Sequence, residues 1–183
     1  MAEDGRERIL AACARIIASS GLAGFRMSEV AREAGVSIGL LAYHFGDRDG
    51  LLQAALDEVN ASAARRAEVQ PDARTPAERL AALLCSEFGE EPGIREGSTT
   101  WNELRSAAVF DAERAAAVSR STADWQRRAR ELLAEADPEG DAEAGALMLT
   151  ALVEGLSGRW LTGQIDAARA QSAVRAAIAA LMP

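Results

Sequence analysis

Side chains that could perform chemistry are scarce in this sequence. The chain contains one histidine, His44, two cysteines and no lysine. No His/Cys cluster has zinc-ligand spacing, and neither a glycine-rich phosphate loop nor a Gly-x-Ser-x-Gly turn is present. The absence of lysine also excludes a Schiff base and a phosphate-loop lysine. The sequence therefore predicts no metal site, no cofactor and no enzymatic activity, and favours a binding role.

The most informative binding pattern lies between residues 27 and 45. Ser28 is expected to cap a short helix over 29–34, Gly35 to end it, and Ser37 to cap a second helix reaching about His44. The start of a helix offers unpaired backbone N–H groups and a positive dipole end to a phosphate. Two short helices joined by a glycine-containing turn are typical of a helix-turn-helix, whose second helix enters the major groove of DNA.

The first residues of the second helix are the expected base-reading residues. They are Ile38, Gly39 and Leu40. Ile38 and Leu40 cannot form hydrogen bonds with bases, so they can contact only apolar groups such as the thymine methyl. Gly39 would allow the backbone to approach closely.

Charge and composition set limits on this hypothesis. The net charge is −8, of which residues 1–66 carry −1 and residues 67–183 carry −7. This balance excludes a broadly basic surface that coats nucleic acid, but allows one locally positive end near the N-terminus. The 41 alanines and the aromatic content of 4% favour helices over sheet. We expect an all-α chain of about nine or ten helices.

The helices that position these residues fall into two predicted domains. Residues 1–50 form a small DNA-binding domain that begins with an amphipathic helix over 6–20, and a linking helix capped by Asp47 covers 47–67. Residues 51–183 form a larger helical domain. After a proline-containing break at 69–76, its helices are predicted at 77–88, 99–109, 112–136, 141–161 and 166–181.

Residues 35–52, GVSIGLLAYHFGDRDGLL, resemble the signature of the tetracycline-repressor (TetR/AcrR) family, and the resemblance covers residues 6–60. The later segments WNELRSAAVFDAER and ALVEGLSGRWLTG resemble the choline-sensing betaine-operon repressor branch of that family. The resemblance implies a helix-turn-helix domain followed by a helical domain for ligand binding and dimerisation.

The family resemblance also implies further DNA contacts beyond Ser37 and the base-reading residues. In the family, the positions of Tyr43, His44 and Arg48 grip phosphates, and Arg48 replaces the usual lysine. Ala42 stands where the family often has a phosphate-contacting tyrosine, so that contact is expected to be missing. For Tyr43 and His44 the alternative is packing against the first helix. The remaining expected contacts are Arg26 and Ser28.

For the larger domain, the resemblance implies a homodimer and a small-molecule ligand. In the family, the helices equivalent to 112–136 and 141–161 meet their symmetry mates in a four-helix bundle. An alanine- and glycine-rich surface is the expected dimer face, although its residues could instead pack within one chain; it consists of Ala142, Gly145, Ala146, Leu149, Val153, Leu156 and Gly158. The expected ligand-binding residues, for which core packing is the alternative, are Phe88, Trp101, Leu104, Arg105, Phe110, Trp125 and Trp160. Glu103 could add a carboxylate, and such an aromatic cage would suit a quaternary ammonium ion.

These observations predict a cytoplasmic regulator without membrane attachment, most often a repressor in this family. It would bind a palindromic operator on double-stranded DNA as a homodimer and be released by a small-molecule inducer. An alternative is a ligand sensor or protein-interaction module on the same scaffold without operator binding. Ala42, the apolar base-reading pair and the acidic charge balance near the helix-turn-helix favour this alternative. A helical enzyme using carboxylates such as Glu103 or Glu154 would need a polar pair in a cleft, which the sequence does not indicate.

Overall fold

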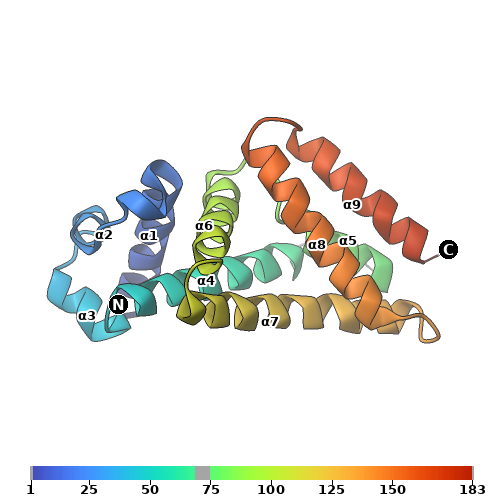
Figure 1. Cartoon of the computed structure of the whole chain (residues 1–183), viewed down its shortest axis with the longest axis horizontal. Coiled ribbons are helices and arrows are strands. Elements are labelled where there is room, and N and C mark those ends of the chain that lie inside the picture. Colours follow the sequence, from blue (N-terminus) through green and yellow to red (C-terminus); the bar gives the residue numbers. More distant parts are fainter. Residues whose placement is uncertain (1, 69–74, 183) are drawn as a thin grey trace. The chain divides into compact units, whose positions relative to one another are not determined.

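The computed structural model describes residues 2–68 and 75–182, and within these ranges it confirms an all-α chain of nine helices (Figure 1). The helices are α1 (Ala2–Gly24), α2 (Met27–Ala34), α3 (Ile38–Phe45), α4 (Arg48–Glu68), α5 (Pro76–Cys85), α6 (Pro92–Ala108), α7 (Ala112–Ala136), α8 (Ala142–Leu161) and α9 (Ala167–Leu181). They belong to two compact units. Unit 1 comprises residues 1–59 and 95–119, and unit 2 comprises residues 60–94 and 120–183.

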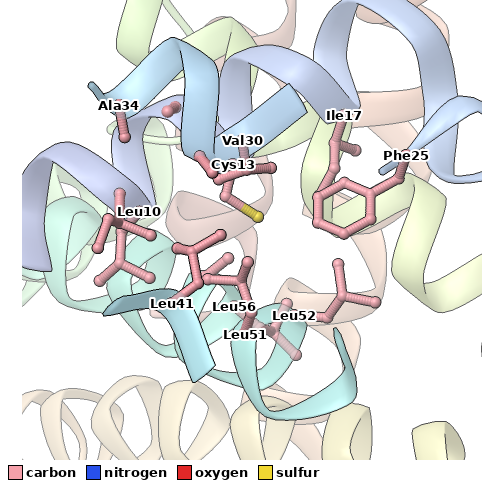
Figure 2. Close-up of a cluster of buried hydrophobic side chains, with 14 of the residues drawn as sticks. Leu10, Cys13, Ile17, Phe25, Val30, Ala34, Leu41, Leu51, Leu52 and Leu56 are labelled. Atoms are coloured by element: carbon pink, nitrogen blue, oxygen red, sulfur yellow. The ribbon is translucent and has the colours of Figure 1, made fainter. Parts of the chain in front are cut away.

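Unit 1 is built around apolar side chains from α1, α2, α3 and α4 that converge on one core (Figure 2). Leu41, on the inner face of α3, is completely buried in it. The Cys13 thiol lies within this cluster, and burial raises the pKa of Cys13 to about 12, so the thiol stays protonated and unreactive. Leu104 from α6 belongs to the same core. The helix-turn-helix is therefore packed together with α6, a helix that lies two elements beyond α4 in the chain.

The turn between α2 and α3 is fixed by its own hydrogen bonds. Gly35 adopts a φ of 67°, and its N–H donates to the Arg32 carbonyl, while the Val36 N–H donates to the Ala31 carbonyl at 2.9 Å. This pair of bonds defines a Schellman motif, which requires a left-handed residue and so favours glycine. The Ser37 Oγ then accepts the Leu40 N–H at 3.1 Å and caps α3, as the sequence predicts.

Two predicted helix starts are wrong. Ser28 does not cap α2, because the helix already begins at Met27 and its N-cap residue is Arg26, which makes no side-chain capping bond. The helix predicted from residue 99 begins at Pro92 instead. Proline is tolerated in the first turn because its missing N–H would have no helical partner there. The proline therefore starts this helix rather than separating two elements. Of the predicted break at 69–76, residues 69–74 lie outside the described residues.

Unit 2 is organised around a hairpin of α8 and α9, with α5 packed against α9 (Figure 1). Asp141 and Asp166 cap α8 and α9 by accepting the N–H groups of Ala144 and Arg169. Most of the predicted dimer face does not lie on the surface of this hairpin, although Ala142, Leu156 and Gly158 are half-buried. Four of its residues are buried inside unit 2, namely Gly145, Ala146, Leu149 and Val153. A methyl group on Gly145 would lie only 3.2 Å from Leu133 of α7, so this side of α8 packs within the chain.

Within the described residues, no helix is long and apolar enough to cross a membrane. The same residues include no group of three or more His, Cys, Asp or Glu side chains that could hold a metal ion.

Candidate nucleic-acid interface

The three predicted base-reading residues occupy the first turn of α3 and point into solvent. Ile38 is 55% exposed, and Gly39 and Leu40 are also exposed. Leu41, the next residue, is buried, so the core fixes which side of α3 faces outward. The Ser37 cap leaves the N–H groups at the very start of α3 free of helical partners, as in any α-helix. This end of α3 therefore presents an apolar contact surface beside backbone donors suited to phosphate.

A row of rings follows on the last turn of α3. Tyr43 is 82% exposed, and its ring lies 5.2 Å from the half-buried His44 ring in an edge-on arrangement. His44 in turn lies 6.0 Å from Phe45, which packs against the core of unit 1. The Arg6 guanidinium from α1 lies 5.7 Å from the centre of the Phe45 ring. Sequence reasoning missed Arg6, because nothing in the pattern of α1 indicates that it meets the end of α3.

The two predicted arginine contacts are held by backbone carbonyls. Arg48 donates from Nη2 to the Leu22 carbonyl at 3.2 Å and lies 5.4 Å from the centre of the Phe25 ring. Arg26 donates from Nη1 to the carbonyls of Ala23 and Phe25. Both side chains are thus positioned by residues 22–25, which form the end of α1 and the residue after it. Ser28 is exposed in the first turn of α2, where its hydroxyl can reach solvent.

Acidic side chains in unit 1 are partly neutralised by arginines of the same unit. Arg15 donates to Glu33 at 3.0 Å, which joins α1 to α2. Arg114 of α7 donates to Asp49 at 3.3 Å and lies 3.1 Å from Asp111. These exposed pairs contribute little to stability, but they lower the negative charge that a phosphate backbone would meet.

One further contact in this unit was not predicted. Glu103 of α6, which sequence reasoning assigned to ligand binding, accepts the Leu22 N–H through Oε2 at 2.7 Å. The two residues are 81 positions apart, so no local pattern could have indicated their contact. Leu22 thus has its N–H bound by Glu103 and its carbonyl bound by Arg48.

The predicted ligand-binding residues divide between the two units. Phe88, Trp125 and Trp160 belong to the core of unit 2, where the rings of Phe88 and Trp160 meet edge-on at 5.9 Å. Trp101, Leu104, Arg105 and Phe110 belong to unit 1. Leu104 is buried in its core, Trp101 packs against that core, and Arg105 donates to Asn102 at 3.1 Å. Phe110, in contrast, is 91% exposed.

Unit 2 also contains a cleft of about 960 Å³. Its lining includes Phe88, Ile94, Cys85 and Gln171 together with charged side chains such as Arg66 and Glu91. Gln171 donates to the Phe88 carbonyl at 2.9 Å and so joins α9 to the segment that follows α5. Among the described residues, Phe88 is the one predicted ligand-binding residue that lines this cleft.

Glu87, the neighbour of Phe88, is a buried carboxyl group. Burial raises the pKa of Glu87 to about 7, although the nearby Arg66 guanidinium acts in the opposite direction. In the unfolded chain the pKa of this carboxyl group is about 4.5. The folded state therefore binds the Glu87 proton more tightly than the unfolded state does. The contribution of this proton to the free energy of unfolding is fully present below pH 4.5 and is lost as the pH rises through 7.

Replacing Glu87 with glutamine is therefore expected to stabilise the fold at pH 8 by up to about 3 kcal/mol, with a smaller gain at pH 5. Urea unfolding at the two pH values measures the change. The matched control is Glu90→Gln, since Glu90 is exposed on the same segment and should show no such difference. If the Glu87→Gln variant were less stable than the natural chain at pH 8, favourable contacts of the ionised carboxylate would outweigh the cost of burying its charge.

Comparisons with known proteins agree with this arrangement. Residues 9–55 match the family model described as bacterial regulatory proteins of the tetR family, and residues 76–183 match that of BetI-type transcriptional repressors, C-terminal. The HTH-type transcriptional regulator BetI of Burkholderia ambifaria is 30% identical over 170 residues, which cover 90% of this chain and 84% of that protein.

Two solved structures show the same fold along nearly the whole chain. A Rhodococcus protein assigned to the TetR family is 38% identical, with a TM-score of 0.94 and coverage of 99% of this chain and all of its own. A Saccharomonospora viridis protein, described as a transcriptional regulator in complex with choline, is 22% identical, with a TM-score of 0.79 and coverage of 97% and 96%. This chain therefore belongs to the TetR family of bacterial transcriptional regulators and carries a BetI-type C-terminal domain.

Proposed function

We propose that this regulator is a repressor that binds a palindromic operator as a homodimer through α3 and leaves the operator when a small molecule binds its C-terminal domain. The observation that carries the proposal is the exposure of Ile38, Leu40 and Tyr43 on a helix whose inner side is fixed by buried Leu41. Large apolar side chains gathered on such a short exposed helix indicate a binding surface. The thymine methyl groups of a major groove offer a matching apolar partner.

The proposed DNA contacts are of two kinds. Ile38, Gly39 and Leu40 read base edges. The remaining residues contact the phosphate backbone: Arg26, Ser28, Ser37, Tyr43, His44 and Arg48. Arg48 suits this role because Leu22 and Phe25 hold its guanidinium in place before DNA arrives, which lowers the ordering cost of binding.

Replacing Arg48 with alanine is expected to weaken binding to all duplex DNA about equally. It should also lower the slope of log affinity against log salt by about one, because one phosphate contact is lost. Fluorescence anisotropy with a random duplex at several salt concentrations measures both quantities.

The control for this experiment is Arg128→Ala, which removes the same charge from an exposed position on α7 in unit 2. An Arg48→Ala variant with the natural salt slope would remove Arg48 from the phosphate contacts. Equal losses in the two variants would indicate a general effect of charge instead of a contact.

For the homodimer, we propose that the outer faces of α8 and α9 pack against a second copy. On α8, Leu147 is 58% exposed and Met148 is 53% exposed, and they continue into exposed Ala151 and Gly155 at helical spacing. On α9, the exposed residues at the same spacing are small, namely Ala168, Ser172, Ala176 and Ala179. Large side chains on one helix and small ones on the next allow two hairpins to interdigitate as a four-helix bundle.

For the ligand, we propose a site in unit 2 that involves Phe88, Trp125 and Trp160. The other residues predicted from sequence belong to unit 1 and are not part of this site, namely Trp101, Leu104, Arg105 and Phe110. Trp125 supports this site because its indole Nε1 is buried and finds no hydrogen-bond partner among the described residues. A buried donor without a partner is costly, and a ligand oxygen would satisfy it. The choline complex of the Saccharomonospora viridis protein makes a quaternary ammonium compound the first ligand to test.

We further infer that the protein acts in the cytoplasm, where bacterial DNA is accessible to it, and that it works by binding and not by catalysis. Its relatives are named as transcriptional regulators, and no residue proposed here has a catalytic task.

A further inference from the structure

The end of α1 has an unusual backbone, and a side chain from far along the chain is bonded to it. Gly21 adopts φ 66° and ψ 173° inside α1, so the helical path breaks there. A side chain at this φ would be strained, and its Cβ would also lie 3.2 Å from Glu103 Oε2. Directly after the break, the N–H of buried Leu22 donates to that same carboxylate oxygen at 2.7 Å.

The other side of Leu22 is bound as well. Its carbonyl accepts from Arg48 Nη2 at 3.2 Å and from the Phe25 N–H at 3.3 Å, and the Arg48 guanidinium lies over the Phe25 ring. Arg48 begins α4, directly after α3 ends at Phe45. Glu103 is thus connected, through one residue, to the arginine at the start of the helix that follows α3.

We propose that Glu103 is a positioning residue for DNA binding, acting through Leu22 on Arg48. The proposal rests on the proposed function, because it gives Glu103 of α6 a role in DNA binding without a contact to DNA. A hydrogen bond from a backbone N–H to a carboxylate is charge-assisted and therefore stronger than a neutral one. This bond keeps the Leu22 carbonyl in the position where it accepts from Arg48. Without the bond, the Leu22 N–H has no acceptor, Leu22 shifts, and the Arg48 guanidinium loses its contact with the Leu22 carbonyl.

The test compares three variants of the full chain. Glu103→Leu removes the acceptor at similar volume, whereas Glu103→Gln keeps an oxygen that can accept the Leu22 N–H. Glu96→Leu is the matched control, because Glu96 is a half-buried carboxylate on the same helix with no such bond shown. We expect Glu103→Leu to lower affinity for duplex DNA about tenfold, and Glu103→Gln and Glu96→Leu to stay within about threefold of the natural chain.

A double-mutant cycle separates positioning from a general loss of structure. If Glu103 acts through Leu22 on Arg48, the double variant Glu103→Leu/Arg48→Ala should bind DNA no more weakly than Arg48→Ala alone. Losses that multiply in the double variant would overturn the proposal. Equal losses in Glu103→Gln and Glu103→Leu would overturn it too, since the glutamine oxygen should rescue binding.

Hydrogen exchange of the Leu22 amide provides a readout that needs no DNA. We expect a slowly exchanging amide in the natural chain and in Glu103→Gln, and a fast one in Glu103→Leu. A protected amide in a natural chain that binds no DNA at low salt would overturn the proposed function while leaving the Glu103–Leu22 bond established. A Leu22 amide that exchanges fast in the natural chain would overturn the present proposal alone.

Discussion

Replacing Leu41 with alanine is expected to destabilise unit 1 by about 2 to 5 kcal/mol and to abolish DNA binding near the growth temperature. Leu41 is completely buried beneath α3, and it contacts the core formed by α1, α2 and α4. Its loss leaves a cavity under the helix that presents the base-reading residues. Thermal unfolding followed by circular dichroism, together with anisotropy on duplex DNA, measures the two effects.

The neighbouring residue provides the control. Leu40→Ala removes the same side chain from an exposed position, so its stability should stay within about 0.5 kcal/mol of the natural chain. This variant should instead lose discrimination at one operator position, because Leu40 is proposed to contact a base. If Leu40→Ala destabilised the fold as much as Leu41→Ala, the orientation assigned to α3 would be wrong. Equal loss on all DNA sequences would remove Leu40 from the base contacts.

Replacing Met148 with arginine is expected to convert the dimer into a monomer at micromolar concentration. In a two-fold symmetric interface each substitution occurs twice, and an unpaired charge buried in an apolar contact costs several kcal/mol. The dimer dissociation constant should therefore rise at least about a hundredfold. Light scattering should report a mass near 19.3 kDa for the variant and twice that value for the natural chain.

Val109→Arg is the matched control for this substitution. Val109 is an exposed apolar residue of unit 1, outside α8 and α9, so an arginine there should leave the dimer intact. A natural chain that is monomeric at micromolar concentration would contradict the dimer itself. A dimer that survives Met148→Arg would place the interface elsewhere.

Local signals in the sequence predicted the helix-turn-helix well. The cap at Ser37, the left-handed Gly35 and the Asp47 cap, which accepts the Gly50 N–H at 2.9 Å, each depend on residues within a few positions. The start of α6 was missed because a proline such as Pro92 is compatible both with the first turn of a helix and with a break between helices. The Ser28 cap was wrong because Ser28 is only one residue into a helix that had already begun.

Long-range placement could not be read in the same way. α8 carries apolar residues on all sides, so periodicity could not distinguish its buried face from its exposed one. Gly145 and Ala146, which were assigned to the dimer face, pack inside the chain. Glu103 likewise belongs to a segment that resembles the ligand domain in sequence. Its contact with Leu22 depends on how α6 packs against α1, which no local pattern describes.

The central claim is that this chain recognises a specific operator. The most direct measurement is selection of bound fragments from random and genomic DNA by the purified protein at moderate salt. We predict recovery of a palindromic motif whose two half-sites match the two-fold symmetry of a homodimer. Recovery of no motif by protein shown to be folded would contradict that claim and favour a ligand sensor on the same scaffold that does not bind DNA.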